Sequence, residues 1–407
     1  KAGSLKSCRP LVKNEIGALR ALAQVILLSY AGSRYNPCQI IRLGLGRLVY
    51  LVGPAAASFC LCLLAMLALR PLAIAVDLID RPGGRKHHTG EVPVVGGLGM
   101  LLGIVLGTGL LPLPDWTAGT LLAACAMLVT VGLVDDRFDL SPWTRLSVQI
   151  AASLTLILGA GATVNSLGAP FGTPIELDGL TSYVITAVSM IAAVNAFNML
   201  DGMDGLAGAL AMVALIALAF LASQGGNAVA LSVSVVIMAA VAAFLLSNLP
   251  IEFNRNVRCF MGDSGSTLLG ISVAWLCVEV SQAATPAAKP MTMLWIVAIP
   301  LFDLCWTVIR RSIRGIPPFR SDQGHFHHLV LRAGFGVKGA FVLLVLLAAI
   351  LAMFGIAIDL AGVSDSWSLV LLVLAGALVV KLLNSPDLIW KMAPRALRHH
   401  RRAVSDP

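Results

Sequence analysis

Long apolar segments dominate this 407-residue chain and constrain its fold more than any other feature. Charged residues make up 12% of the sequence and hydrophobic residues 58%, whereas a soluble domain carries about 25% charged residues. A helix that crosses a bilayer needs about 20 mostly apolar residues. The segments are too continuous for the alternating strands of a membrane barrel. The sequence therefore predicts an all-α, polytopic membrane protein with about eleven transmembrane helices.

These helices are expected near residues 47–69, 94–112, 117–134, 146–164, 181–198, 205–223, 228–248, 265–281, 292–309, 339–358 and 367–383. They form a predicted transmembrane domain over 47–383, followed by a basic tail over 384–407. Residues 1–47 hold eight Lys and Arg against one Glu. We expect a basic N-terminal extension over 1–46, which the charge pattern assigns to neither side of the membrane.

Five polar clusters interrupt the apolar chain, at residues 80–88, 135–139, 195–205, 260–265 and 321–328. Two predicted helices separate each cluster from the next, so all five fall on one side of the membrane. That side and the tail carry 19 Lys and Arg, whereas the connections on the other side carry one, Lys289. Positively charged loops stay in the cytoplasm. The net charge of +8 is therefore interpreted as an orientation signal and not as a nucleic-acid surface.

The cluster at 135–139 contains Asp135, Asp136 and Asp139. Three carboxylates this close repel one another unless a cation lies between them, and Mg²⁺ prefers such oxygen ligands and shares them with substrate phosphates. A solvated helix end, paired with Arg137, is the simpler alternative. Acidic side chains at the edge of a membrane segment are usually retained for function, which favours a magnesium site.

Two further clusters supply amides and acids. Asn195, Asn198, Asp201 and Asp204 recur every three residues, which keeps them on one slowly drifting face of a helix. Amides can orient a sugar or a nucleobase, and an Asn oxygen can also ligate Mg²⁺. Asp263 precedes an apolar segment, where it could simply cap a helix. Facing the other acids, Asp263 becomes the best candidate for a metal ligand.

The remaining two clusters are basic. Arg85 and Lys86 lie in a loop rich in Gly and Pro, and His325, His327 and His328 lie in the longest predicted cytoplasmic connection. Zinc is disfavoured, because no Cys or Glu partner stands at metal-site spacing. Positive groups beside a divalent cation neutralise a phosphate in transfer. The combined residue types indicate transfer of a phosphate-containing group from a soluble donor to a membrane lipid.

From Asp77 to Phe335, the order of these clusters closely resembles the polyprenyl-phosphate N-acetylhexosamine-1-phosphate transferases of glycosyltransferase family 4. NAFNMLDGMDGL and HFHHL are similar to the branch that uses UDP-GlcNAc. The resemblance implies transfer of GlcNAc-1-phosphate from UDP-GlcNAc to undecaprenyl phosphate with release of UMP, Mg²⁺ or Mn²⁺ as cofactor, and a place in the inner membrane of a bacterium. A homodimer is expected by analogy.

The resemblance also implies a role for each candidate residue. The implied catalytic acids are Asp135, Asp136, Asp201 and Asp204. The implied metal ligands are Asp263, Asn198 and Asp135. The implied substrate-binding residues are Lys86, Arg85, Asn195, Asn198, His325, His327 and His328. Which acid acts on the lipid phosphate stays open, as do the sugar and the polyprenol length.

Three alternatives remain at this point. Another UDP-N-acetylhexosamine, or the phospho-MurNAc-pentapeptide donor, would use the same chemistry. An intramembrane prenyltransferase would use DDRFD as its diphosphate motif, but Asp201 and Asp204 do not supply the expected second motif. A flippase for lipid-linked sugars would place its polar groups at the middle of the membrane, whereas here they gather at one side.

Overall fold

The computed structural model describes residues 37–80, 92–249, 258–315 and 324–385. The chain divides into two compact units, Lys1–Val52 and Gly53–Pro407. In the first unit the structure describes the beginning of α2 (Pro37–Ala75), so the helix runs through the predicted boundary at residue 46. The remainder of the predicted extension and residues 386–407 of the predicted tail lie outside the described residues.

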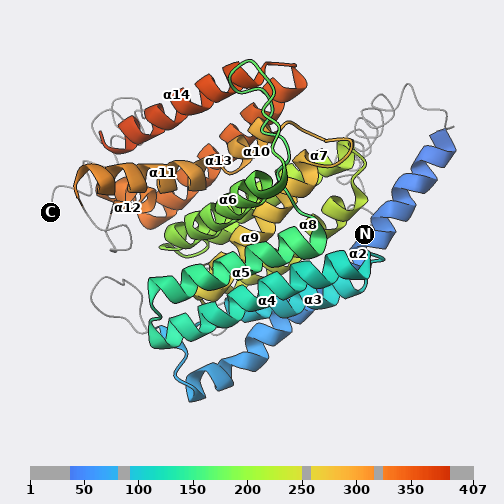
Figure 1. The fold of residues 1–407 in the computed structure, drawn as a ribbon. Coiled ribbons are helices and arrows are strands. Elements are labelled where there is room, and N and C mark those ends of the chain that lie inside the picture. Colours follow the sequence, from blue (N-terminus) through green and yellow to red (C-terminus); the bar gives the residue numbers. More distant parts are fainter. Residues whose placement is uncertain (1–36, 81–91, 250–257, 316–323, 386–407) are drawn as a thin grey trace, which may run out of the picture. The chain divides into compact units, whose positions relative to one another are not determined.

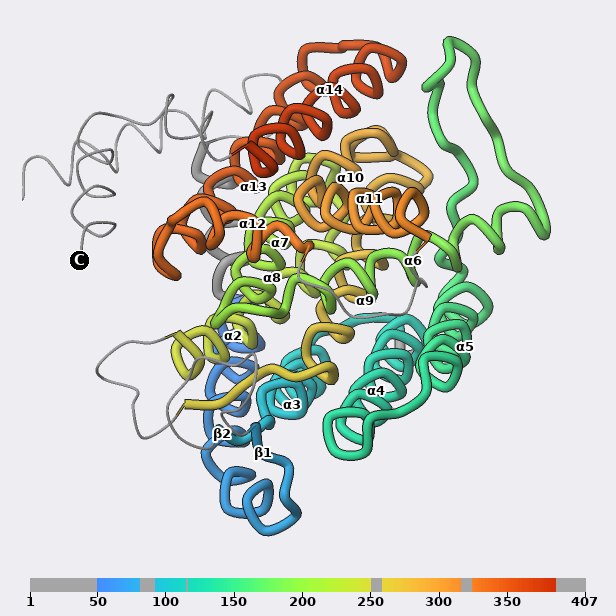
Figure 2. Tube along the Cα trace, turned by 90° about the vertical axis from the view of Figure 1, so that its left-hand side faces the viewer, coloured from blue at the N-terminus to red at the C-terminus, as the bar shows by residue number. Residues whose placement is uncertain are grey.

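The second unit is built of helices that run roughly side by side (Figure 1). After α2 come α3 (Gly96–Gly109), α4 (Asp115–Phe138), α5 (Pro142–Ala160), α6 (Gly179–Leu200), α7 (Leu206–Gln224), α8 (Ala228–Asn248), α9 (Gly262–Ser281), α10 (Pro290–Ile296), α11 (Ala298–Ile313), α12 (Phe326–Arg332), α13 (Val337–Leu360) and α14 (Asp365–Leu383). Strands β1 (Ile79–Asp80) and β2 (Val92–Pro93) pair antiparallel, beside α2 and α3 (Figure 2).

Within the described ranges, eight helices are long and apolar enough to cross a membrane, or up to nine if the bent pair α10–α11 is one span. The predicted all-α, multi-pass membrane architecture is confirmed, but the predicted number of eleven spans is not. Helix α3 has 14 residues, about 21 Å of helix, which is shorter than the hydrocarbon core. The predicted span 292–309 is broken, with α10 and α11 meeting at 82°. Pro300 lies in the first turn of α11 and cannot donate a backbone hydrogen bond across the break.

Helix α9 is the centre of the bundle, because 89% of the residues in its most apolar stretch are buried. Small residues let neighbouring backbones approach it closely, as is common in membrane proteins. A Cβ built at Gly132 of α4 would lie 2.3 Å from Ser264 Cα, and one built at Gly97 of α3 would lie 2.4 Å from Gly265 N. On its other side, Gly270 lies against the backbone of α6. These contacts fix the N-terminal end of α9 against α3 and α4.

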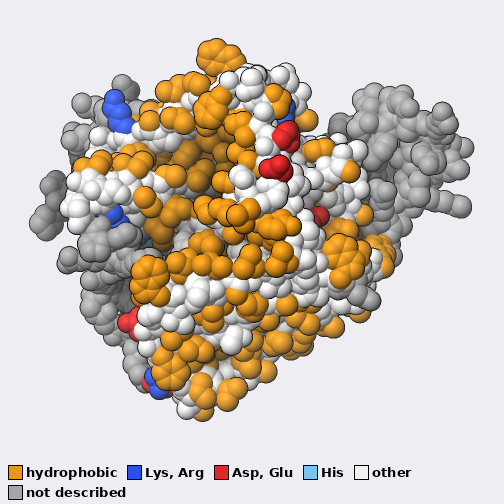
Figure 3. Space-filling model, in the orientation of Figure 1, with side chains coloured by type: hydrophobic (Ala, Val, Ile, Leu, Met, Phe, Trp, Pro, Cys, Tyr) orange, Lys and Arg blue, Asp and Glu red, His pale blue; other side chains and the backbone are white. Residues whose placement is uncertain are grey.

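The outer helices carry the opposite pattern. In helices α13 and α14, only 28% of the residues in the most apolar stretch are buried. Side chains such as Leu346, Met353 and Leu374 are more than half exposed. Figure 3 shows hydrophobic side chains spread over most of one face, with few charged ones. Such a surface matches lipid and not water.

Lys289 connects two helices at the end of the bundle away from the polar clusters. Its Nζ donates to Val363 O at 2.7 Å and lies 3.6 Å from Asp359 Oδ1. Asp359 Oδ2 also accepts from Thr292 Oγ1 at 2.6 Å. The sequence distinguished Lys289 only as the single basic residue of the far side. The structure adds that it joins the start of α10 to the end of α13.

Replacing Gly132 with Ala should destabilise the protein, because a methyl group there meets the backbone of α9 with no side chain able to yield. We expect a loss of about 1–3 kcal/mol, seen as a lower thermal denaturation midpoint of the purified protein. Gly119→Ala is the matched control on the same helix, because nothing lies within 4 Å of that position. Equal midpoints for the two variants would contradict the close contact of α4 with α9.

Candidate active site

The turn between α4 and α5 positions Asp135. Helix α4 ends at Phe138, and the next residue, Asp139, has a left-handed backbone with φ 51°. The chain then reverses, and Ser141 caps α5 by accepting from Thr144 N. This reversal brings Leu140 N to within 2.7 Å of Asp135 Oδ1, and Arg145 Nη1 to within 2.9 Å of Asp135 Oδ2. The Asp135 side chain is only 4% exposed, so these donors are its main solvation.

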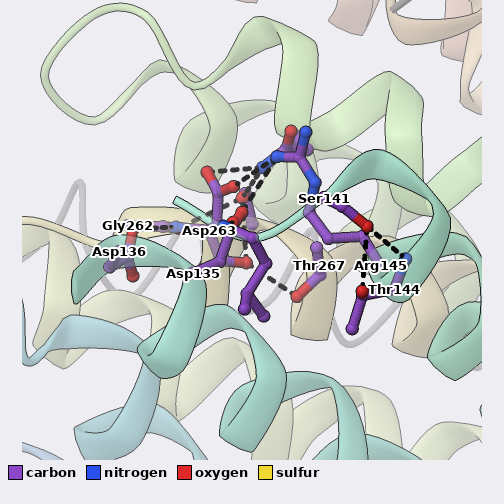
Figure 4. A network of polar contacts seen from close by, with 11 residues as sticks. Asp135, Asp136, Ser141, Thr144, Arg145, Gly262, Asp263 and Thr267 are labelled. Carbon is purple, nitrogen blue, oxygen red and sulfur yellow. Dashed lines mark hydrogen bonds and ion pairs between the residues drawn. The ribbon is translucent and has the colours of Figure 1, made fainter. Parts of the chain in front are cut away.

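Asp263 meets this pair from α9. Gly262 takes φ +66°, and Asp263 N then donates to Asp136 Oδ1 at 3.0 Å. Asp263 Oδ2 lies 3.4 Å from Arg145 Nη1, so one guanidinium contacts Asp135 and Asp263 together (Figure 4). The predicted acids of two clusters, 128 residues apart in the chain, therefore share one site.

The amides of α6 divide between two tasks. Asn198 Nδ2 donates to Asp263 Oδ1 at 2.9 Å and to Ser266 Oγ at 3.0 Å. Asn195 Nδ2 instead donates to Gln149 Oε1 and to Ile191 O, both at 2.8 Å. Asn198 thus belongs to the acidic cluster, whereas Asn195 joins α6 to α5 one turn away.

Asp201 and Asp204 lie in the turn after α6. Burial raises the pKa of Asp201 above its usual range, and the charges of Asp263, Asp136 and Asp204 raise that pKa further. Asp201 therefore holds a proton at a higher pH than an ordinary aspartate. Asp204 has a counter-ion of its own, because it forms an ion pair with Arg258, whose guanidinium also lies 5.4 Å from the ring centre of Phe260. Arg258 was not predicted to have a role.

The histidine segment is attached to α11 by Asp303. His325 Nδ1 lies 2.8 Å from Asp303 Oδ2, and Phe326 N donates to Asp303 Oδ1 at 2.6 Å. Asp303 is fully buried and was missed by the sequence analysis. The sequence did contain a sign of its importance, because an acidic residue inside an apolar span is energetically costly and is usually retained for function. Because Asp303 takes the Nδ1 side of the ring, His325 keeps Nε2 for a ligand.

His327 is buried and lies against the turn after α6. Its ring stacks on His325 at 6.0 Å and lies 4.1 Å from the ring of His328. A Cβ at Gly202 would lie 2.3 Å from His327 Nε2, so the imidazole packs directly on that glycine. Burial, together with the neighbouring His328 and His325, lowers the pKa of His327 to about 3. His327 is therefore neutral at physiological pH and offers a phosphate no charge.

A cavity of about 720 Å³ opens beside the cluster. Its polar wall includes Asp135, Arg145, Gln149, Asn195, Asn198, Asp263, Thr267, Thr307 and His325. Its apolar wall includes Leu128, Val131, Leu146, Val188, Ile191, Leu304 and Val308, from α4, α5, α6 and α11. Five predicted site residues thus meet in one cavity, namely Asp135, Asn195, Asn198, Asp263 and His325.

The predicted phosphate-binding pair Arg85 and Lys86 lies outside the described residues. The strand that follows them is nevertheless attached to the site. Phe260 N donates to Pro93 O, and Gly96 N donates to Phe260 O, both at 2.9 Å. Phe260 is three residues before Asp263, so the described end of this segment is fixed to the beginning of α9.

Comparison with known proteins bears on this site. A family profile described as glycosyl transferase family 4 matches residues 118–281. A protein of Escherichia coli strain K12 is 36% identical over 305 residues, which cover 75% of this chain and 83% of the relative. The chain belongs to glycosyl transferase family 4. The resemblance predicted from the motifs is thereby confirmed.

The relatives carry one name. The proteins of Escherichia coli strain K12, Yersinia pestis and Haemophilus influenzae are each named undecaprenyl-phosphate alpha-N-acetylglucosaminyl 1-phosphate transferase. The Yersinia pestis protein is 37% identical over 288 residues, 70% of this chain and 78% of its own. The Haemophilus influenzae protein is 35% identical over 298 residues, 72% of this chain and 82% of its own. The family 4 profile spans α4 to α9 and so includes the clusters at 135–139, 195–205 and 260–265, but not the histidine segment.

The site residues of this family 4 member can be tested against a divalent cation. Among the described residues, no three His, Cys, Asp or Glu side chains are grouped to hold a metal ion. Mg²⁺ does not need such a group, because it is usually bound by one or two carboxylates and completed by water and substrate phosphates. Asp135 and Asp263 already share one cationic group, and Asn198, whose Nδ2 donates to Asp263 Oδ1, carries a further amide oxygen. This donor set fits a magnesium or manganese ion.

Asp303→Asn should loosen the histidine segment, because an amide cannot accept from both Phe326 N–H and the His325 ring with its full charge. Hydrogen bonds to a charged group contribute about 1.5–3 kcal/mol. We therefore expect amide hydrogen exchange across α12 to become about tenfold faster, measured by mass spectrometry, with exchange in α13 unchanged. Unchanged exchange in α12 would show that Asp303 does not hold the segment.

His327 should make stability depend on pH. Its pKa is lower in the folded protein, so the unfolded chain binds a proton that the folded chain rejects, and stability falls as the pH drops below about 6.5. Between pH 6.5 and 5 this amounts to about 2 kcal/mol. Thermal denaturation of His327→Gln should therefore depend less on pH over this range than that of the unaltered chain. The same dependence in both would place a charged, exposed imidazole at this position.

Proposed function

We propose that this chain transfers N-acetylglucosamine 1-phosphate from UDP-GlcNAc to undecaprenyl phosphate and releases UMP, at the cytoplasmic face of a bacterial inner membrane. One observation carries the proposal: a cavity between membrane-spanning helices has an apolar wall and a polar wall, and the polar wall ends in the pair Asp135 and Asp263. A lipid phosphate needs both walls at once. The names of the relatives favour undecaprenyl phosphate and N-acetylglucosamine.

The reaction is a displacement at phosphorus. An oxygen of the lipid phosphate forms a bond to the β-phosphorus of UDP-GlcNAc, and the bond from that phosphorus to the bridging oxygen breaks. UMP leaves with the bridging oxygen and its electron pair. A phosphate monoester has a second pKa of about 6, so the attacking oxygen is already largely ionised at neutral pH. Orientation and neutralisation of charge, and not removal of a proton, are then the main tasks of the protein.

The described residues support these tasks. Asp135, Asp263 and the amide oxygen of Asn198 are the ligands we assign to Mg²⁺, or to Mn²⁺ in its place, which would offset the negative charge of the phosphates. Asp136 accepts from Asp263 N and so holds the beginning of α9 in place. His325 lines the cavity and its Nδ1 side is engaged by Asp303, which leaves Nε2 for the donor; Nε2 can donate to a phosphate oxygen when the ring carries both protons. Asp201, with its raised pKa, can donate a hydrogen bond to the nucleotide sugar.

The other predicted residues take supporting places in the proposal. We assign Arg85 and Lys86 to the donor phosphates on the basis of the sequence. Asp204 already pairs with Arg258, so we assign it to shaping the turn that carries Asp201 and Gly202. The apolar wall on α4, α5, α6 and α11 would receive the first isoprene units of the acceptor. The cytoplasmic orientation rests on the charge asymmetry of the loops.

The direct test uses the purified full-length chain in lipid nanodiscs with undecaprenyl phosphate, Mg²⁺ and one donor at a time: UDP-GlcNAc, UDP-GalNAc or UDP-MurNAc-pentapeptide. We expect UMP release and a radiolabelled lipid product with UDP-GlcNAc, and loss of both after chelation with EDTA. Asp263→Asn should lower the rate by about 10²–10³-fold. Glu176→Gln, an exposed carboxyl in the α5–α6 connection, should leave it unchanged.

Other outcomes would reject the proposal in whole or in part. Preference for another donor would reject N-acetylglucosamine as the sugar but keep the chemistry. Prenyl transfer to an aromatic acceptor, without UMP release, would assign the acids to a prenyltransferase. Full activity of Asp263→Asn would remove the proposed cation site.

A further inference from the structure

Arg145 occupies the place between the two acidic clusters. It lies in the first turns of α5, a helix whose outward side chains Trp143 and Leu158 are both 69% exposed. Its Nη1 is 2.9 Å from Asp135 Oδ2 and 3.4 Å from Asp263 Oδ2, and the guanidinium reaches across the turn toward both (Figure 4). In the sequence, Arg145 was distinguished only as one of the basic residues on the cluster side.

Both oxygens of Asp263 are engaged by N–H donors. Asn198 Nδ2 donates to Oδ1, and Arg145 Nη1 lies closest to Oδ2. A divalent cation bound by Asp263 would therefore stand a few ångströms from a guanidinium. Like charges at such a separation repel each other. The ion and the guanidinium therefore compete for Asp263.

The same geometry explains why a protein cation, the guanidinium of Arg145, is needed at this site when no metal ion is bound. The Asp135 side chain is 4% exposed, and a buried carboxylate without a counter-charge is costly. Arg145 is 36% exposed and has a long, flexible side chain, so it can leave without disturbing the helices. Its contact with Asp263 is the longer of the two, and the Asp263 side chain is 34% exposed. Asp263 is thus the carboxylate that an arriving ion can take first.

We propose that Arg145 is the resident counter-charge of the cation site: it pairs with Asp135 and Asp263 while no divalent ion is bound, and yields Asp263 when the ion binds. This rests on the proposed function, which places the ion at these residues. Arg145 is a positioning residue in this account, because it acts through the two carboxylates. It keeps the acids close together between catalytic cycles without a tightly held metal.

Removing the guanidinium distinguishes this role from a purely structural one, because the two predict opposite signs. If Arg145 competes with the ion, Arg145→Gln binds Mn²⁺ more tightly, by about tenfold. If Arg145 merely braces the ligands, the same variant binds Mn²⁺ more weakly. The competing role also predicts that the metal-free variant is less stable and that Mn²⁺ restores its stability, because ligand binding stabilises the folded state.

The test measures Mn²⁺ binding to the full-length chain in nanodiscs by electron paramagnetic resonance, together with thermal denaturation with and without Mn²⁺. Arg145→Gln and Arg145→Lys are compared with the unaltered chain. Arg137→Gln is the matched control, since it removes one positive charge from the end of α4 but pairs with Asp77 at 3.6 Å and touches neither acid. We expect tighter binding and a larger Mn²⁺-induced rise in midpoint for Arg145→Gln, with affinities near the unaltered value for Arg145→Lys and Arg137→Gln.

The outcomes separate the two proposals. An unaltered chain that binds no Mn²⁺ and transfers no sugar phosphate overturns the proposed function, and this inference with it. An unaltered chain that does both, while Arg145→Gln binds Mn²⁺ equally or more weakly, overturns the role of Arg145 alone. If Arg145→Gln yields no folded protein, an affinity of Arg145→Lys well below that of the unaltered chain would overturn it as well.

Discussion

The close approach of α4 to α9 is the contact on which the rest of the site depends. Gly132 lies against Ser264 with no room for a methyl group, and this crossing is less than one helical turn from Asp135 on one helix and beside Asp263 on the other. Because the backbones touch, carboxylates from two distant segments come within reach of one guanidinium. Helix α6 then adds Asn198 from the opposite side. The site is therefore a consequence of small residues packing in lipid.

Charge compensation explains the partners that surround this contact. Three described acids near the site have donors of their own: Asp135 has Arg145, Asp204 has Arg258, and Asp303 has the His325 ring and Phe326 N. Buried carboxylates are tolerated only with such partners. His327 achieves the same end by remaining neutral, since burial lowers its pKa to about 3. Protein groups thus offset these acids, and Asp263, whose side chain is 34% exposed, is more accessible to a ligand than Asp135.

The sequence predicted the class of fold from the length of the apolar segments. It also predicted that the acidic clusters meet, although the count of eleven spans used for that prediction is not confirmed. Asp135, Asn198 and Asp263 lie together as expected. The pairing of Asp303 with His325 could not be predicted, since it depends on the 82° bend between α10 and α11. Hydropathy alone predicts one straight span over residues 292–309. Arg145 was missed for a similar reason: the left-handed Asp139 turns α5 back toward α4, and no composition pattern reveals that reversal.

The central claim is that Asp135, Asp263 and Asn198, from three helices, bind one divalent cation. An experimental structure of the full chain with Mn²⁺ and UDP, with the ion located by anomalous scattering, tests it most directly. The account predicts a single peak within ligand distance of Asp263, Asp135 and Asn198, with the guanidinium of Arg145 withdrawn from Asp263. A peak at the histidine segment, or an ion bound while Arg145 still contacts Asp263, would contradict it.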